Sequence, residues 1–252
     1  MSCCGHLALP GVGHRPIEPA RSRPMTFDRR SVLFGTAAAF AAPLLSVPPA
    51  YADAKRQALV DSSLEAARKI LAGKDYPDAP RYMDGARGVL IVPELIQGGL
   101  IFGLAGGRGT LMARSAPKNW SPPAFYAMGS GSVGLQIGAK VSEVVFIIKT
   151  EKGLQAILDH KFKFGVEAGV SLAVVGIGIE GATTAAGGAD IIAFASSQGL
   201  FAGATLEGSF LDPDNDWNAL YYGSGASTRA IVIDRKFTNP GAEPIRQFMA
   251  KW

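Results

Sequence analysis

Three glycines near the middle of the chain have the spacing of a dinucleotide-binding loop. Gly129, Gly131 and Gly134 fill the pattern G-x-G-x-x-G, and the acidic residue Glu151 follows about 20 residues later. In a nucleotide-binding fold these glycines come between a strand and a helix, and the helix N-terminus faces the pyrophosphate. The stretch therefore raises the hypothesis of an oxidoreductase that holds NAD or FAD.

The residues after the glycines do not support this hypothesis. Leu135, Ile137, Ala139 and Val141 alternate with polar residues or glycine, which is the repeat of a strand and not of a helix. A single G-x-G-x-x-G motif is weak evidence without the strand and helix on either side. We therefore expect no nucleotide cofactor in this stretch.

An acidic stretch has part of the pattern of a calcium loop. Asp212, Asp214 and Asp216 occupy the first, third and fifth positions, but Trp217 and Gly223 stand where a calcium loop needs glycine and glutamate. Without these two residues the loop lacks both its sharp turn and its bidentate ligand. The stretch fits an acidic surface turn better than a metal site.

Few other residues could act in catalysis. Of the three histidines only His160 follows residue 24, both cysteines (Cys3 and Cys4) precede it, and no serine stands in G-x-S-x-G. A catalytic triad or a site with several histidine or cysteine ligands is therefore excluded after residue 24. We expect no catalytic residue, no metal and no cofactor, so the protein is not predicted to be an enzyme.

The N-terminal part has the pattern of an export signal. Arg29 and Arg30 precede an apolar run over residues 32–47, which the A-x-A sequence of residues 50–52 follows. Paired arginines also occur in twin-arginine signals, so both this route and the Sec route stay open. We interpret residues 1–24 as an upstream extension, residues 25–54 as a signal peptide and residues 55–252 as the folded domain. The predicted location is the periplasm or the extracellular space, in peripheral contact with a membrane.

The charge of the folded part is nearly balanced. Residues 1–52 contain five of the 25 lysines and arginines and two of the 21 acidic residues, which leaves 20 positive and 19 negative side chains. Such a balance disfavours nucleic acid as a general partner.

The pattern of apolar residues after the leader predicts an α+β domain. Residues 55–73 form a helix, with Val60, Leu64 and Leu71 at helical spacing, and shorter helices are expected from Glu151 and at residues 242–252. Between them lie short apolar runs separated by glycines, including a predicted strand at residues 228–234. We expect an N-terminal helix, a strongly curved antiparallel sheet or barrel-like body, and a C-terminal helix.

The first helix is also a candidate lipid-binding element. It combines basic residues with an apolar stripe, and each basic side chain contributes about 1 kcal/mol near an anionic membrane. The competing interpretation is that the stripe packs against the sheet. The candidate lipid-binding residues are Lys55, Arg56, Val60, Leu64, Arg68, Lys69 and Leu71.

The order of motifs resembles the SYLF domain. The stretches "ARGVLIVPELIQGGLIFGLAGGRGTLMAR" and "WSPPAFYAMGSGSVGLQIGAK" are similar to its first half, and "SSQGLFAGATLEGSFL" with "NALYYG" is similar to its second half. The likeness extends over residues 59–248. Matching positions are Gly107, Gly109, Arg114, Trp120, Pro123, Gln136, Gly138, Gly199, Gly203, Glu207, Gly208, Asn218, Tyr222 and Gly223.

The resemblance implies a non-enzymatic module that binds an anionic phospholipid or a membrane surface. Eukaryotic SYLF domains bind phosphoinositides with the help of an N-terminal amphipathic helix, and yeast members bind actin. The segment "GIGIEGATTAAGGAD" is similar to the bacterial branch, in which actin binding is not expected. A protein partner, for instance in the organisation of the envelope, stays open as an alternative. On this interpretation Gly129, Gly131 and Gly134 are turn and curvature residues of the sheet.

Overall fold

The computed structural model of the protein describes residues 49–99, 102–133, 138–159, 161–166, 169–177, 188–198, 206 and 208–252. The predicted extension, most of the predicted signal peptide, and His160 lie outside the described residues.

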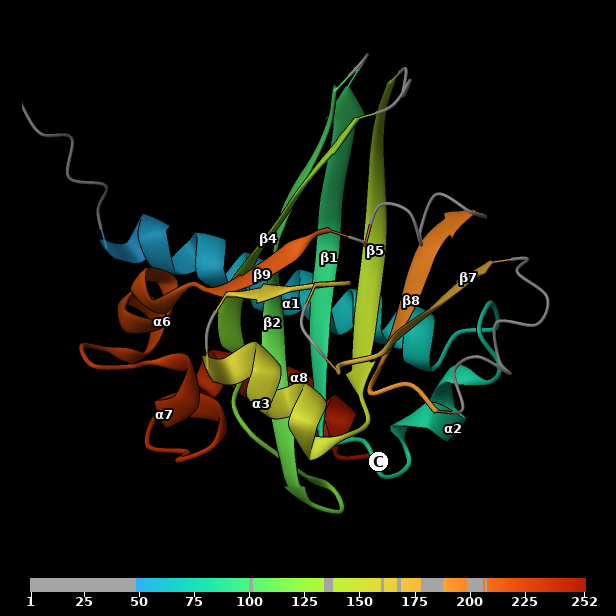
Figure 1. The fold of residues 1–252 in the computed structure, drawn as a ribbon. Helices are drawn as coiled ribbons and strands as arrows, with labels where there is room; N and C mark the ends of the chain where they lie inside the picture. Colours follow the sequence, from blue (N-terminus) through green and yellow to red (C-terminus); the bar gives the residue numbers. More distant parts are fainter. Residues whose placement is uncertain are drawn as a thin grey trace, which may run out of the picture. The chain divides into compact units, whose positions relative to one another are not determined.

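The described chain is an α+β domain, as predicted (Figure 1). Its helices are α1 (Pro49–Leu71), α2 (Ala79–Met83), α3 (Glu151–Asp159), α6 (Asn215–Tyr222), α7 (Thr228–Val232) and α8 (Glu243–Met249), with a 3-10 turn at Pro240–Ala242. Its strands are β1 (Gly88–Gly99), β2 (Phe102–Ala116), β3 (Asn119–Trp120), β4 (Ala124–Val133), β5 (Gly138–Ile148), β6 (Phe162–Lys163), β7 (Leu172–Ile177), β8 (Ile191–Gln198) and β9 (Phe210–Pro213).

These strands form one strongly curled sheet in the order β6-β9-β4-β2-β1-β5-β8-β7, with β3 paired to β2. The pairing is antiparallel except between β7 and β8, which run parallel. The predicted antiparallel sheet is therefore a mixed one. A parallel pair needs a crossover between its strands, and apolar runs in the sequence do not reveal the direction of a crossover.

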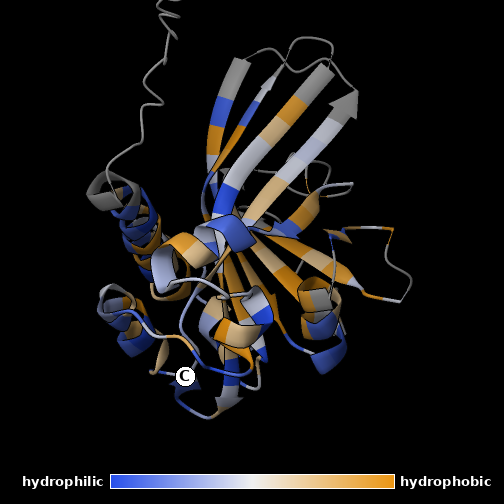
Figure 2. Cartoon of the chain, turned by 90° about the vertical axis from the view of Figure 1, so that its left-hand side faces the viewer, coloured by the Kyte–Doolittle hydropathy of each residue, from blue (hydrophilic) through white to orange (hydrophobic). Residues whose placement is uncertain are grey.

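Strand β1 is buried on both faces over its first half. Val89 and Ile91 face one apolar cluster with α1 and α8, whereas Leu90 and Val92 face a second cluster with α3 and α7. This arrangement explains why the sequence here is a continuous apolar run without polar alternation. Figure 2 shows the apolar residues concentrated where helices cover the sheet.

A β-bulge interrupts β1 at Pro93. Ile91 pairs with Thr110 of β2, but the next pair is Glu94 with Arg108, so β1 contains one additional residue. Opposite the bulge, the β1 backbone leaves no room for a side chain on β2. A Cβ atom added at Gly109 would lie 2.5 Å from the carbonyl oxygen of Ile91.

Helix α1 packs across the sheet. Its apolar stripe, which includes Val60, Leu64, Ile70 and Leu71, is buried in the first cluster. The helix ends at Leu71, and Gly73 follows where a side chain would collide with the carbonyl oxygen of Lys69. The predicted helix and its glycine stop are confirmed.

The predicted strand at residues 228–234 is wrong, because the segment contains helix α7. The Ser227 side chain accepts a hydrogen bond from the backbone N–H of Ala230 and so caps the helix, while Ile231 and Val232 are buried against the sheet. Packing of the β-branched residues overrides their preference for strands. Helices α3 and α8 form where they were predicted.

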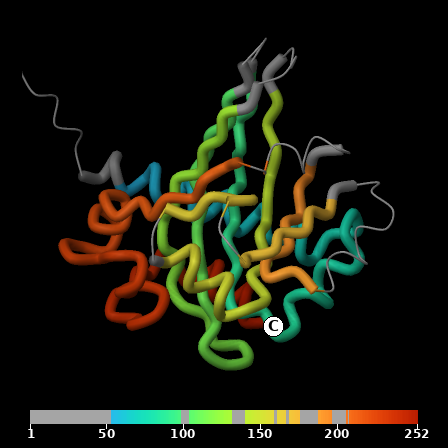
Figure 3. Tube along the Cα trace, viewed as in Figure 1, coloured from blue at the N-terminus to red at the C-terminus, as the bar shows by residue number. Residues whose placement is uncertain are grey.

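The far halves of β1, β2, β4 and β5 extend beyond the helices (Figure 3). Ile96 on β1, Leu104 on β2 and Val141 on β5 are 51%, 70% and 58% exposed there. The register pairs Ile96 with Val141 and with Gly106. Leu104 precedes Gly106 by two residues on β2, so all three exposed residues share the face of the sheet on which α1 lies.

We predict opposite effects of alanine at two glycines of β2. Gly109→Ala should lower the free energy of unfolding by about 1–3 kcal/mol, because its methyl group meets the bulge backbone. Gly106→Ala should be neutral or stabilising by up to about 1 kcal/mol, because the nearest atom would be 3.9 Å from the new Cβ. Urea unfolding of both variants measures the difference. Equal destabilisation would contradict the role assigned to the bulge.

Candidate functional site

The seven candidate residues of α1 divide into a docked set and an exposed set. Val60, Leu64 and Leu71 are buried against the sheet. Arg56 is also buried, with its guanidinium 5.3 Å from the ring centroid of Trp217, and Lys69 pairs with Glu143 at 2.5 Å. Lys55, Arg68 and Lys69 are exposed, so Lys69 combines an ion pair to the sheet with an open side chain.

The structure adds polar contacts that hold α1 in place. The Gln57 amide donates to the carbonyl oxygen of Gly241 at 2.9 Å and accepts from the Tyr221 hydroxyl at 2.7 Å. Burial is the main cause that raises the pKa of Tyr221 to about 12. Helix α1 is thus fixed to α6 and to the C-terminal segment as well as to the sheet.

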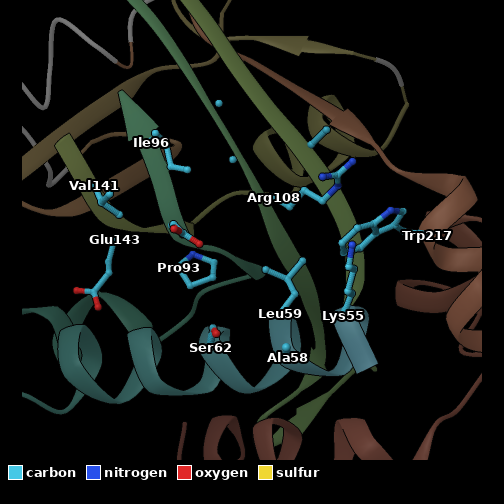
Figure 4. Close-up of a pocket in the computed structure, with 14 residues that line it drawn as sticks. Lys55, Ala58, Leu59, Ser62, Pro93, Ile96, Arg108, Val141, Glu143 and Trp217 are labelled. Carbon is cyan, nitrogen blue, oxygen red and sulfur yellow. The ribbon is translucent and has the colours of Figure 1, made fainter. Parts of the chain in front are cut away.

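A groove of about 870 Å³ lies between α1 and the extended strands (Figure 4), and we name it the α1 groove. Its volume falls within the range of small-molecule sites. Among the residues that line it are Lys55 and Leu59 from α1, Ile96 and Val141 from the sheet, Arg108 from β2 and Trp217 from α6.

Arg108 is held at one side of this groove. Its guanidinium lies 4.3 Å from the ring centroid of Trp217, and its Nε lies 3.2 Å from the Asp214 carboxylate. Asp214 is also the N-cap of α6 and accepts a hydrogen bond from the backbone N–H of Trp217. The groove therefore combines an oriented cation with exposed apolar side chains. Sequence reasoning identified only Lys55 of this set.

A second hollow of about 570 Å³ continues the α1 groove along the extended strands, and we name it the glycine trough. The two share Ile96 and Gly106. The trough is also lined by Leu104, Gly129 and Phe210.

The glycines of the apparent nucleotide fingerprint lie in a strand. Gly129 and Gly131 are interior residues of β4 and pair with Gly106 and Leu104, so they are neither turn residues nor part of a loop that opens a helix. Gly134 lies outside the described residues. At Gly129 a Cβ atom would lie 2.6 Å from the Phe210 ring, so the missing side chain leaves room for this ring.

The carboxylates of the apparent calcium loop do not converge. Asp212 pairs with Lys161 at 3.6 Å, and Asp214 caps α6. In the part of the chain that the structure describes, no group of three or more His, Cys, Asp or Glu could hold a metal ion.

Among the described residues, no helix is both long and apolar enough to cross a membrane.

Several positions that match the SYLF pattern support the fold. Asn218 is fully buried, and its side-chain oxygen accepts from the backbone N–H of Phe125 at 2.8 Å. Its amide nitrogen lies 3.2 Å from the Thr228 hydroxyl. The Tyr222 hydroxyl donates to the carbonyl oxygen of Pro123 at 2.6 Å, and burial raises the pKa of Tyr222. These residues connect α6 and α7 to β4.

Comparison with known proteins gives the same family. The family model Ysc84, described as "Las17-binding protein actin regulator", matches residues 129–252. Protein YSC84 of Saccharomyces cerevisiae is 27% identical over 70% of this chain and 38% of its own length. LAS seventeen-binding protein 3 of the same yeast is 28% identical over 73% of this chain and 42% of its own length.

The likeness extends to vertebrates. SH3 domain-containing YSC84-like protein 1 of Xenopus laevis is 29% identical over 60% of this chain and 45% of its own length. The matches thus span less than half of the length of these relatives. The chain belongs to the SYLF (Ysc84) domain family.

Loss of the Asn218 side chain should destabilise the fold. We expect Asn218→Ala to lower the free energy of unfolding by about 1–3 kcal/mol, because the N–H of Phe125 would remain buried without its acceptor. Leu220→Ala on the same helix is the control, since Leu220 is 57% exposed and the change should stay within about 0.5 kcal/mol. Chemical denaturation of both variants decides whether Asn218 has this structural role.

Proposed function

We propose that the protein is a non-enzymatic module that binds anionic phospholipid surfaces. The observation that carries this proposal is the group of exposed apolar side chains Ile96, Leu104 and Val141 on the extended strands, beside the cations Lys55 and Arg108. Exposed apolar patches with a charged border are typical of interaction surfaces. The family membership supports a binding role over a catalytic one.

The extended strands are better suited to first contact than the apolar stripe of α1. The stripe is docked, and its release would also uncover Ile91, Met112 and other sheet residues beneath it. Uncovering four large apolar side chains on each side costs about 6–12 kcal/mol per side. A membrane could rebury the helix side but not the sheet side, and four basic residues return only about 4 kcal/mol.

Lys55 and Arg68 remain the α1 residues that we propose to meet lipid phosphates. Both are exposed while α1 is docked, although Arg68 pairs with Glu65 at 2.9 Å. Exposed pairs of this kind contribute little and are readily exchanged. Arg56 is buried beside Trp217, and Lys69, although 54% exposed, pairs with Glu143 of β5, so both serve the docking of α1 in this proposal.

A protein partner is the competing proposal. It is supported by the names of the relatives, which describe Las17 binding and actin regulation for those proteins.

Within the lipid proposal, selectivity for phosphoinositides would require a convergent group of cations. The mixed charges of Lys55, Glu94, Arg108 and Glu143 around the α1 groove favour a lipid of low charge.

Membrane binding should depend on the three exposed apolar residues. Each gives about 1 kcal/mol on insertion, half of what full burial contributes, so the triple variant Ile96→Ser, Leu104→Ser, Val141→Ser should bind about 100-fold more weakly. Sedimentation with phosphatidylglycerol vesicles measures this loss. Pure phosphatidylcholine vesicles should bind the parent protein less well, and added salt should weaken binding to the anionic vesicles.

The matched control is the triple variant Val166→Ser, Leu220→Ser, Ile233→Ser. These residues are 64%, 57% and 38% exposed and lie elsewhere on the surface, so their loss should leave sedimentation unchanged. If neither vesicle type binds the parent protein, the lipid proposal is wrong and the protein-partner proposal is favoured.

We also propose that the protein is exported to the bacterial cell envelope. The support is the order of paired arginines, apolar run and A-x-A sequence in residues 29–52. N-terminal sequencing of the protein from the periplasmic fraction should find a chain that begins between residues 53 and 55. Recovery of a chain that still contains Arg29 would contradict export with cleavage.

A further inference from the structure

The floor of the glycine trough lacks side chains at Gly106 and Gly129, and apolar side chains surround it. Across neighbouring strands the register aligns Phe210, Gly129, Gly106 and Ile96 in one row on one face of the sheet. The two glycines stand in the middle of the row, and the large side chains stand at its ends. The row therefore leaves a depression in the sheet face on which α1 also lies.

Only part of this floor is covered. The Phe210 ring fills the space above Gly129, where a Cβ atom would lie 2.6 Å from it. Above Gly106 the nearest atom to an added Cβ would be a backbone oxygen 3.9 Å away. The remaining space has apolar walls from Ile96, Leu104 and Phe210. Its apolar lining suits a flexible hydrocarbon chain.

A cation of the adjoining α1 groove lies next to the trough. Arg108 follows Gly106 by two residues on β2 and so lies on the same face. Its partners are the Trp217 ring and the largely buried carboxylate of Asp214, while the Arg108 side chain itself is 48% exposed. A ligand anion can compete with Asp214 for the guanidinium, because about half of the Arg108 side chain is open to solvent. Glu94 pairs with Arg108 in the register and disfavours a ligand with several negative charges.

We infer that the glycine trough binds the acyl chain of one monoanionic lipid, with its headgroup at Arg108. The inference rests on the proposed lipid function and goes beyond it, because it requires binding of a single molecule in the absence of a membrane. The acyl chain lies over Gly106 between Phe210 and Ile96. The headgroup competes with the Asp214 carboxylate for the Arg108 guanidinium.

The test uses laurate below its critical micelle concentration, measured by titration calorimetry with the full chain. Laurate should bind with a stoichiometry of one, and decanol, which has no charge, should bind more weakly. Gly106→Val fills the depression and should lower laurate affinity by about tenfold or more. Gly131→Val is the matched control: its new Cβ has no neighbour within 4 Å, Gly131 does not line the trough, and affinity should be unchanged.

The headgroup position has its own pair of variants. Arg108→Gln should weaken laurate binding by about fivefold, whereas Asp214→Asn should strengthen it by a similar factor, because it removes the competing carboxylate. Asparagine is a good N-cap, so α6 should remain intact. Unchanged melting temperatures and near-ultraviolet circular dichroism confirm that each variant is folded.

Each other outcome overturns the inference. If Gly106→Val binds laurate as well as the parent, the chain does not lie in the trough. If Gly106→Val instead abolishes self-association while laurate binding persists, the trough holds a second copy of the protein. If the parent sediments with vesicles but does not bind laurate, the inference fails while the proposed function stands, and failure of both measurements rejects both.

Discussion

The bulge at Pro93 determines which side chains of β1 face the α1 groove. Before the bulge, Ile91 points towards α1 and Val92 towards α3. Because the bulge adds one residue, Glu94 and Ile96 point to the same side as Ile91, and Leu95 points to the other. A regular strand would reverse these positions and bury Glu94 in the second cluster. The bulge in turn depends on Gly107 and Gly109, since only residues without a side chain fit opposite it.

This constraint divides the sheet into two regions with different physical roles. Below the bulge, helices cover both faces, and the buried rows of β1 and β5 give the domain its core. Above it, glycines replace large residues at many positions of β2 and β4, so the sheet presents its backbone and a few apolar side chains. Helix α1 lies at the border of the two regions, and the α1 groove forms there.

The sequence predicts the parts of this structure that depend on local pattern. Regular spacing of Val60, Leu64 and Leu71 predicts α1, and continuous apolar runs predict the central strands. Ile231 and Val232 mislead because their tertiary packing outweighs their strand preference. Pro93 inside an apolar run is a signal for a bulge that could have been recognised, since proline is confined to edges and bulges of sheets.

The candidate site was not predictable in the same way, because its members come from separate elements. Lys55, Ile96, Arg108, Val141 and Trp217 are far apart in the sequence, and no spacing rule connects them. The same basic residues that suggest a membrane-binding helix in the sequence have different roles in the fold. Arg56 and Lys69 contact Trp217 and Glu143 and thereby hold α1 at the border of the groove. A helix held in this way forms one wall of a binding groove without leaving the sheet, and the surface available to a ligand then depends on the sheet residues beside it.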